Sequence, residues 1–141
     1  GASGYTGLEL VKMLVTHPRF TLTYLATTQG DTTIDQLHPS LQDVISLKVD
    51  KADASDVAEK CDSVFLALPH KASMGFAKEL LAKGVKVVDL SADYRLELDV
   101  YEEHYCEHED KDHLDEAVYG LIEYYREELK NTNLAAGPGC Y

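Results

Sequence analysis

Apolar residues along the chain alternate between helical spacing and short continuous runs. Residues 6–16 and 72–83 place their apolar side chains at helical spacing, which predicts two helices. Residues 63–68 are continuously apolar after Ser63, as is typical of a strand buried on both faces of a sheet, and residues 85–90 are interpreted as the next buried strand. Weaker patterns predict strands over 20–27, 45–49 and 133–136, a helix from Asp53 or Ser55 to Lys60, and a helix over 124–130. Strands and helices that alternate in this order predict an α/β fold with a mostly parallel sheet.

Composition limits the size of the fold and the class of partner. The chain has 141 residues, 45% of them hydrophobic, and no linker divides it, so residues 1–141 are interpreted as one domain. Its 13 basic and 25 acidic side chains give a net charge of −12, which argues against nucleic-acid or anionic-membrane partners. No apolar run reaches the length of a membrane span. Much of the acid lies between Glu97 and Glu116, which we expect to form a solvated surface segment.

Three glycines are spaced three residues apart directly before the first predicted helix. Glycine lets a backbone turn tightly and approach a pyrophosphate, while the helix that follows directs free N–H groups at the anion. The candidate cofactor-binding residues of this loop are Gly1, Ser3, Gly4, Tyr5, Thr6 and Gly7. An ordinary glycine turn before a helix would show the same spacing. A dinucleotide loop normally follows a strand, so we expect that strand to be cut off or left out of this sequence.

The strand predicted over 20–27 would be the second strand of such a fold, and the residues at its end indicate which dinucleotide is bound. An acidic residue there would bind the ribose 2′-hydroxyl of NAD, but this chain has Thr27, Thr28 and Gln29. Two hydroxyls and no carboxylate favour the 2′-phosphate of NADP, although no arginine stands beside them.

A candidate nucleophile lies at the other end of the sequence. Cys140 follows Pro138 and Gly139 directly after a predicted strand, where a thiol can be presented to a ligand. A buried, unreactive cysteine is the alternative. Cys61, at a helix end, and Cys106, among carboxylates, are weaker candidates. An odd number of widely spaced cysteines argues against a disulfide framework and favours a cytoplasmic protein.

Histidines provide two further candidate sites. His70 follows Pro69 at a strand end and could face a cofactor, or it could be a capping or surface residue. The acidic segment carries four potential metal ligands, His104, Cys106, His108 and His113. Their spacing matches no tight zinc pattern, so we expect no metal site.

Five stretches, taken in order, give the chain a family resemblance. They are GASGYTG (1–7), LALPH (66–70), VVDLSADYR (87–95), AVYGL (117–121) and PGCY (138–141). Together they resemble the N-acetyl-γ-glutamyl-phosphate reductase family, within the wider group of aspartate-semialdehyde dehydrogenases. The resemblance implies a Rossmann-like NADP-binding domain, followed in the family by a second domain for catalysis and dimer contacts. It implies NADPH-dependent reduction of an acyl phosphate, N-acetyl-glutamyl 5-phosphate, through a cysteine thioester, by a homo-oligomer.

The resemblance also implies roles for individual residues. Cys140 matches the nucleophile, and Gly4, Tyr5, Thr6 and Gly7 match the phosphate-binding loop. Four residues match positions near the cofactor, namely Thr27, Thr28, Pro69 and His70. Three match a segment near the substrate, Ser91, Asp93 and Arg95. Arg95 is the candidate to hold a substrate carboxylate or phosphate, and a salt bridge with Asp93 is its structural alternative.

The chain departs from the family pattern at three places. Gly137 stands where the family usually has Asn, Ile122 stands where Pro is frequent, and the arginine after the second strand is missing. The family's acid/base histidine belongs to the second domain. The alternatives are a related acyl-phosphate reductase, acting on aminoadipyl phosphate or of the aspartate-semialdehyde dehydrogenase type, and a non-catalytic nucleotide-binding module.

Overall fold

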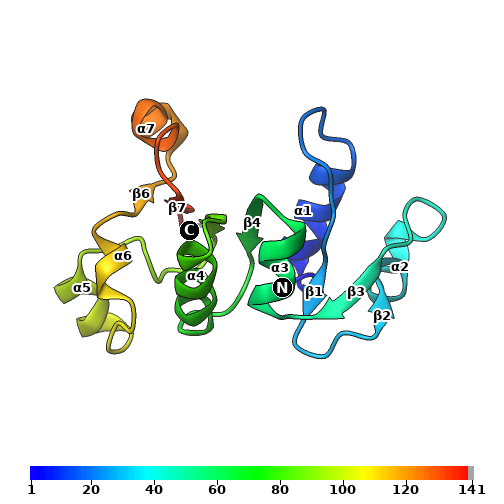
Figure 1. Cartoon of the computed structure of the whole chain (residues 1–141), viewed down its shortest axis with the longest axis horizontal. Coiled ribbons are helices and arrows are strands. Elements are labelled where there is room, and N and C mark those ends of the chain that lie inside the picture. The colour runs from blue at the N-terminus through cyan, green and yellow to red at the C-terminus, as the bar shows by residue number, and fades with distance from the viewer. Residues whose placement is uncertain (140–141) are drawn as a thin grey trace. The chain divides into compact units, whose positions relative to one another are not determined.

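The computed structural model describes residues 1–139 and divides into two compact units, Gly1–Cys61 and Asp62–Tyr141 (Figure 1). Each unit is an α/β assembly with its own sheet, and each is described separately. The assignment of residues 1–141 to one domain stays a prediction. The elements of the first unit are α1 (Tyr5–Val15), β1 (Ala26–Thr27), β2 (Thr32–Thr33), α2 (Ile34–Leu37), η1 (Pro39–Leu41), β3 (Lys48–Lys51) and α3 (Ala54–Lys60).

The first unit is organised around a three-stranded sheet in the order β1-β3-β2. β1 runs parallel to β3, with Ala26 opposite Asp50, whereas β2 is antiparallel to β3. The core combines apolar residues from the glycine loop, α1, α2, η1 and β3. Its buried members are Ala2, Val11, Leu25, Ile34, Leu41 and Val49. The core therefore ties the glycine loop to the segment that contains α2 and η1.

Local signals set the helix boundaries in this unit. The predicted helix over 6–16 is confirmed as α1, which buries Gly7 and Val11 and ends before the His17-Pro18 pair. Of the two predicted caps for α3, Asp53 is the one used, because its carboxylate accepts hydrogen bonds from the N–H groups of Ser55 and Asp56.

The strand predicted over residues 20–27 is much shorter in the structure. Only Ala26 and Thr27 form a ladder, with Asp50 and Lys51 of β3. A β-branched sequence becomes a strand only where a neighbour supplies backbone partners, and before Ala26 the backbone hydrogen bond to β3 is the one that Leu25 accepts from Asp50. The strand predicted over 45–49 is likewise displaced, to Lys48–Lys51.

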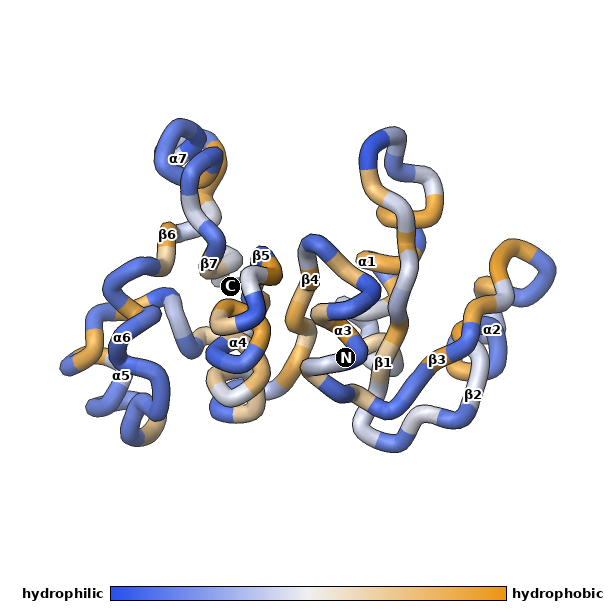
Figure 2. Tube along the Cα trace, in the orientation of Figure 1, coloured by the Kyte–Doolittle hydropathy of each residue, from blue (hydrophilic) through white to orange (hydrophobic). Residues whose placement is uncertain are grey.

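The second unit contains a four-stranded sheet whose described pairs are all parallel, in the order β4-β5-β7-β6. Its elements are β4 (Ser63–Leu66), α4 (Ala72–Ala82), β5 (Lys86–Asp89), α5 (Leu98–His104), α6 (Lys111–Leu114), β6 (Val118–Tyr119), α7 (Ile122–Leu129) and β7 (Leu134–Ala136). The apolar run of β4 is clear in Figure 2, and α4 packs against β5. The predicted strands over 63–68, 85–90 and 133–136 and the helix over 72–83 are confirmed, and with them the α/β class.

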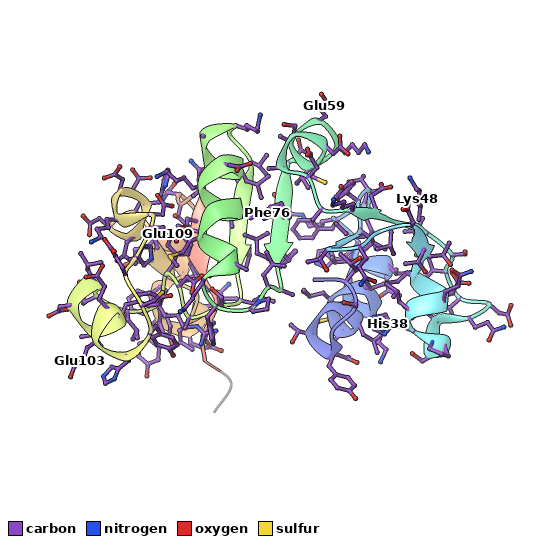
Figure 3. All side chains as sticks on the ribbon, turned by 90° about the horizontal axis from the view of Figure 1, so that it is seen from below. His38, Lys48, Glu59, Phe76, Glu103 and Glu109 are labelled. Atoms are coloured by element: carbon purple, nitrogen blue, oxygen red, sulfur yellow. The ribbon has the colours of Figure 1, made fainter. Side chains whose placement is uncertain are left out.

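The acidic segment between Glu97 and Glu116 differs in part from the sequence prediction. It was expected to be a solvated surface segment, but Tyr101, His108 and Asp110 are each at most 1% exposed. Acidic side chains such as Glu103 do point outward (Figure 3), so the segment combines a solvated face with a buried polar one. The prediction is confirmed for most acidic side chains of the segment and wrong for Asp110, because charge density alone does not show which polar groups find buried partners.

Within residues 1–139, no helix is both long enough and apolar enough to cross a bilayer.

Candidate cofactor loop and strand-end site

The glycine loop of the first unit is shaped by close backbone contacts. A Cβ at Gly7 would lie 2.3 Å from the carbonyl oxygen of Gly1 and 2.9 Å from the Cα of Ala2, so only glycine allows α1 to begin this close to the loop. Gly4, by contrast, has room for a side chain, since the nearest atom to its Cβ would be 3.9 Å away. The third glycine of the motif is therefore the one that the packing requires.

The amino end of α1 presents a site suited to an anion. Among the described residues, no side chain caps this helix, and its first turn contains no acidic residue. Its first N–H groups have no partner within the helix, which leaves them and the positive end of the dipole directed at whatever binds there. Ser3, Tyr5 and Thr6 are exposed at this end. Gly7 lets the loop pack closely against the start of α1, and the uncapped donors at this end fit a pyrophosphate.

The two threonines after β1 occupy different positions. The hydroxyl of Thr27 accepts a hydrogen bond of 2.9 Å from the N–H of Gly30, so this residue shapes the turn that follows β1. Thr28 is exposed. Gly30 adopts a φ of +71°, and a Cβ there would lie 2.3 Å from the nitrogen of Lys51. The turn after β1 is thus tightly held, with the Thr28 side chain accessible beside it.

His38 is a residue of this site that sequence reasoning missed. Its Nε2 lies 2.7 Å from the carbonyl oxygen of Ala2, in the glycine loop, and the ring is only 9% exposed. Because a carbonyl can only accept, Nε2 carries the proton and donates it. Figure 3 shows His38 between the ribbons of α1 and α2. No local pattern points to this contact, which joins residues 36 positions apart.

In the second unit, the parallel strands bring three predicted loops to one edge of the sheet. The loops that follow β4, β5 and β7 all leave the carboxyl ends of their strands, where ligands of open α/β sheets bind. Backbone hydrogen bonds join them, since Leu90 N–H donates to Leu66 and Gly137 N–H donates to Asp89. The sheet therefore brings together Pro69 and His70 with the segment from Ser91 to Arg95.

His70 is held by the loop after β5. The N–H of Ala92 donates to Nδ1 of His70 over 2.9 Å, so the neutral ring carries its proton on Nε2. The ring also makes an edge contact with Tyr105, with centroids 5.3 Å apart. Since His70 is exposed, its Nε2–H is available as a hydrogen-bond donor at the end of β4.

Asp89 organises the start of this loop from inside the protein. Its carboxylate is fully buried and accepts hydrogen bonds from the hydroxyls of Ser73 and Ser91, the latter over 2.5 Å. The hydroxyl of Ser91 in turn accepts from the N–H of Asp93 over 3.0 Å. Ser91, predicted to bind substrate, is only 2% exposed and is engaged in this network. A polar residue within the apolar run 85–90 was the sequence signal that could have identified Asp89.

Asp93 makes a second buried network. Its carboxylate accepts from the N–H of Lys71, over 3.0 and 3.1 Å, and from the hydroxyl of Tyr101, over 2.8 Å. Lys71 has a φ of +72°, a conformation that non-glycine residues rarely adopt, and Asp93 holds its backbone there. Asp93 is fully buried, so its observed role is to fix the loop that carries His70.

Arg95 connects the loop after β5 with the loop after β7. Its Nε donates to the carbonyl of Gly137 over 2.5 Å, and its Nη2 donates to the carbonyl of Leu90 over 2.7 Å. The alternative considered from the sequence, a salt bridge with Asp93, is not among the described ion pairs. A Cβ at Gly139 would lie 3.5 Å from Nη1, so the guanidinium reaches the turn that precedes Cys140.

Gly137, one of the departures from the family pattern, lies in a confined space. It is buried, and a Cβ there would lie 3.0 Å from Cδ2 of Leu90 and 3.1 Å from the carbonyl oxygen of Asp89. An asparagine at this position would require those neighbours to shift by a few tenths of an ångström. Cys140 lies outside the described residues, so its role as nucleophile stays a prediction.

Two buried tyrosines complete the support of this edge. Tyr94 donates to Asp110 over 2.7 Å, and burial, followed by this hydrogen bond, raises the pKa of its hydroxyl far above the ordinary value. Burial and the hydrogen bond to Asp93 raise the pKa of Tyr101 in the same way. His108 donates from Nε2 to the carbonyl of Asp93 over 2.7 Å and accepts at Nδ1 from the N–H of Asp110.

Two of the four candidate metal ligands, His108 and His113, are used in such contacts. His113 lies 2.8 Å from Asp110 through Nδ1, and His108 spans two backbone groups. Within residues 1–139, no group of three or more histidine, cysteine, aspartate or glutamate side chains is arranged to hold a metal ion.

An α/β fold with a glycine loop before its first helix, and with loops at the carboxyl ends of parallel strands, is typical of a dinucleotide-binding protein. Residues 1–132 match the family model described as Semialdehyde dehydrogenase, NAD binding domain, and the chain belongs to this family. A nicotinamide dinucleotide is accordingly the class of cofactor.

Relatives of known name point the same way. The chain is 79% identical over its whole length to an N-acetyl-gamma-glutamyl-phosphate reductase of Sulfurovum sp. (strain NBC37-1), and 58% identical to one of Wolinella succinogenes. In both cases it covers 42% of the relative's length, so it spans less than half of these proteins.

Solved structures support the fold. The crystal structure of aspartate semialdehyde dehydrogenase II from Vibrio cholerae, complexed with ASA, matches 99% of the chain with a TM-score of 0.66 and 16% sequence identity. The chain covers 40% of that protein. At this identity the match shows the fold alone, which confirms the Rossmann-like architecture predicted from the resemblance.

Proposed function

We propose that the chain is the amino-terminal, NADP-binding part of an N-acetyl-γ-glutamyl-phosphate reductase. The observation that carries the proposal is the identity of 79% over the whole chain to a relative of that name. Its alternatives, a related acyl-phosphate reductase or a non-catalytic module, have no comparable support. As predictions from the resemblance we keep a cytoplasmic homo-oligomer whose second domain supplies the acid/base histidine.

The proposed reaction uses Cys140 as the nucleophile. Its thiolate attacks the acyl carbon of N-acetyl-glutamyl 5-phosphate, and the bond between that carbon and the phosphate oxygen breaks. Inorganic phosphate departs, and the acyl group remains on Cys140 as a thioester. NADPH, when bound, supplies the hydride that reduces this thioester. The resulting thiohemiacetal collapses to N-acetylglutamate 5-semialdehyde and restores the thiolate. Covalent catalysis is needed because a thioester accepts hydride far more readily than a carboxylate does.

The loops at the sheet edge of the second unit would support this chemistry by fixing the backbone before Cys140 and the position of the Arg95 guanidinium. Arg95 binds the carbonyl of Gly137, immediately before the Pro-Gly-Cys turn, and its Nη1 reaches Gly139. We propose that this guanidinium steadies the turn and offers its remaining donors to an acyl-phosphate oxygen. Ser91 and Asp93, predicted from the resemblance to bind substrate, would then act by positioning, because both are buried and hydrogen-bonded within the protein.

The cofactor proposal rests on the loop and on the turn after β1. Gly4, Tyr5, Thr6 and Gly7 would hold the pyrophosphate, and Thr28, exposed beside a turn with no carboxylate, would receive the 2′-phosphate of NADP. Pro69 and His70 would line the nicotinamide side, with His70 offering its Nε2–H.

The test is made on the full-length protein that carries this chain. Turnover of N-acetyl-glutamyl 5-phosphate with NADPH is expected, and Cys140→Ser is expected to reduce it to background while leaving NADPH binding intact. Iodoacetamide should alkylate Cys140 much faster than Cys61 and Cys106, both of which are half-buried. Equal, slow alkylation of the three thiols, or full turnover by Cys140→Ser, would contradict the proposal.

A further inference from the structure

We propose that His38 is a positioning residue that holds the glycine loop in its cofactor-binding shape before the cofactor arrives. The inference rests on the proposed binding of NADPH by that loop. It is carried by the hydrogen bond of 2.7 Å from Nε2 of His38 to the carbonyl of Ala2. Nothing in the sequence pattern or the family description assigns this residue a role.

Both backbone groups of Ala2 are fixed. Its N–H donates to the carbonyl of Ala26, at the start of β1, over 3.0 Å, and its carbonyl receives His38. Ala2 itself is only 7% exposed, so water does not readily replace a lost partner. With Ala2 fixed on both sides, the residues that follow are directed toward the amino end of α1.

His38 is itself held rigidly. It lies between α2 and η1, where its own N–H donates to the carbonyl of Ile34 over 2.9 Å and its carbonyl accepts from Leu41 over 2.8 Å. Ile34 and Leu41 are buried in the core of the unit. Pro39 follows His38 and restricts it to the extended backbone observed, with φ −131° and ψ 93°. The imidazole thus projects from a fixed point of the core.

The physical consequence is preorganisation. A loop that is already in its bound conformation pays less conformational entropy on binding, and so binds more tightly with no additional contact to the ligand. The contacts of Gly7 exclude one set of alternative loop conformations, and the His38–Ala2 hydrogen bond excludes others. Loss of that bond should therefore weaken NADPH binding without removing any group that touches the cofactor.

The test compares two amides of different reach. In His38→Gln the side-chain N–H₂ group lies near the position of Nε2 and can still donate to Ala2, whereas in His38→Asn it is too short. His38→Asn is expected to raise the dissociation constant for NADPH about tenfold, the equivalent of roughly 1.4 kcal/mol. His38→Gln should restore most of the affinity. His104→Asn, at an exposed histidine of α5, is the matched control.

Two measurements on the full-length protein separate positioning from general destabilisation. The first is a fluorescence titration with NADPH. The second is hydrogen exchange without cofactor, in which the amides of residues 2–8 should exchange faster in His38→Asn while those of Val49 and its neighbours in β3 do not.

Every outcome of the titration and the exchange measurement either supports or contradicts the positioning role of His38. Unchanged affinity in His38→Asn, equal losses in the Asn and Gln variants, or faster exchange throughout the unit would overturn the inference. If the unaltered protein fails to bind NADPH, it is the proposed function that fails.

Discussion

At Gly7 the absence of a side chain determines where a helix can begin. The position a Cβ would occupy is already filled by the carbonyl of Gly1 and the Cα of Ala2, both of them backbone atoms that no rotamer change can move. The same chain contains Gly75, inside α4, where a Cβ would meet nothing within 4 Å. Identical substitutions at the two glycines therefore isolate the effect of the close contact.

Gly7→Ala is expected to displace the loop and to weaken NADPH binding by more than about tenfold, or roughly 1.4 kcal/mol. Gly75→Ala should leave binding unchanged and raise the free energy of unfolding by about 0.5–1 kcal/mol, because alanine has the better helix propensity. Titration with NADPH and urea unfolding of the full-length protein check both. Unaltered NADPH affinity in Gly7→Ala would remove the loop from the cofactor site.

The loops at the sheet edge of the second unit are joined through one segment. The segment from Asp89 to Arg95 holds the loop after β4 through Asp93 and Ala92, and the loop after β7 through Arg95. Arg95 makes its two contacts from separate nitrogens of one planar group, to carbonyls on different loops. Lysine has a single nitrogen and cannot reproduce this geometry.

Arg95→Lys is expected to lose one or both of these hydrogen bonds and to lower the free energy of unfolding by about 1–3 kcal/mol. Alkylation of Cys140 by iodoacetamide, in the absence of substrate, should slow because the turn before it is less well held. Arg126→Lys, at an exposed position of α7, is the control and should change neither measurement. A higher KM for the acyl phosphate with unchanged stability and alkylation would instead indicate that Arg95 only binds substrate.

On the scale of the whole molecule, buried tyrosines link stability to pH. Tyr94 is 3% exposed and Tyr101 is fully buried, and both have a pKa raised above the ordinary value of 10.0. Above pH 10 an unfolded tyrosine releases its proton while the folded one keeps it, so the folded state binds more protons. Their contribution to stability is complete below pH 10 and is lost as the pH rises further.

Between pH 10 and 11 the free energy of unfolding should therefore fall by at most about 1.4 kcal/mol for each buried tyrosine. Tyr94→Phe should be less stable at pH 8, because Asp110 loses a donor, but should show a shallower decline above pH 10. Tyr124→Phe, at a side chain that is 79% exposed, should keep the original slope. Urea unfolding at a series of pH values measures these slopes, and a Tyr94→Phe slope equal to that of the unaltered protein would contradict the prediction.

The hydrophobic pattern was sufficient to predict the two longest helices and three of the four strands in the sheet of the second unit. Helix α1, helix α4 and the strands β4, β5 and β7 follow from spacing and apolar runs, because backbone hydrogen bonding makes both periodicities local properties of the sequence. The parallel order then places His70 and Arg95 on loops at one edge of a sheet. The extent of β1 was not predictable in this way, since it depends on which residues find backbone partners in β3, a segment distant in the sequence.

The sequence by itself determined the α/β class, the glycine spacing before α1 and the residues that could bear chemistry. Only the tertiary structure decided which polar groups are buried and what they hold: His38 against Ala2, Asp93 against Lys71, and His108 and Asp110 inside an acidic segment. These pairs depend on where distant segments meet. A buried polar group is stable only with a partner, and local sequence does not show whether folding will bring that partner to it.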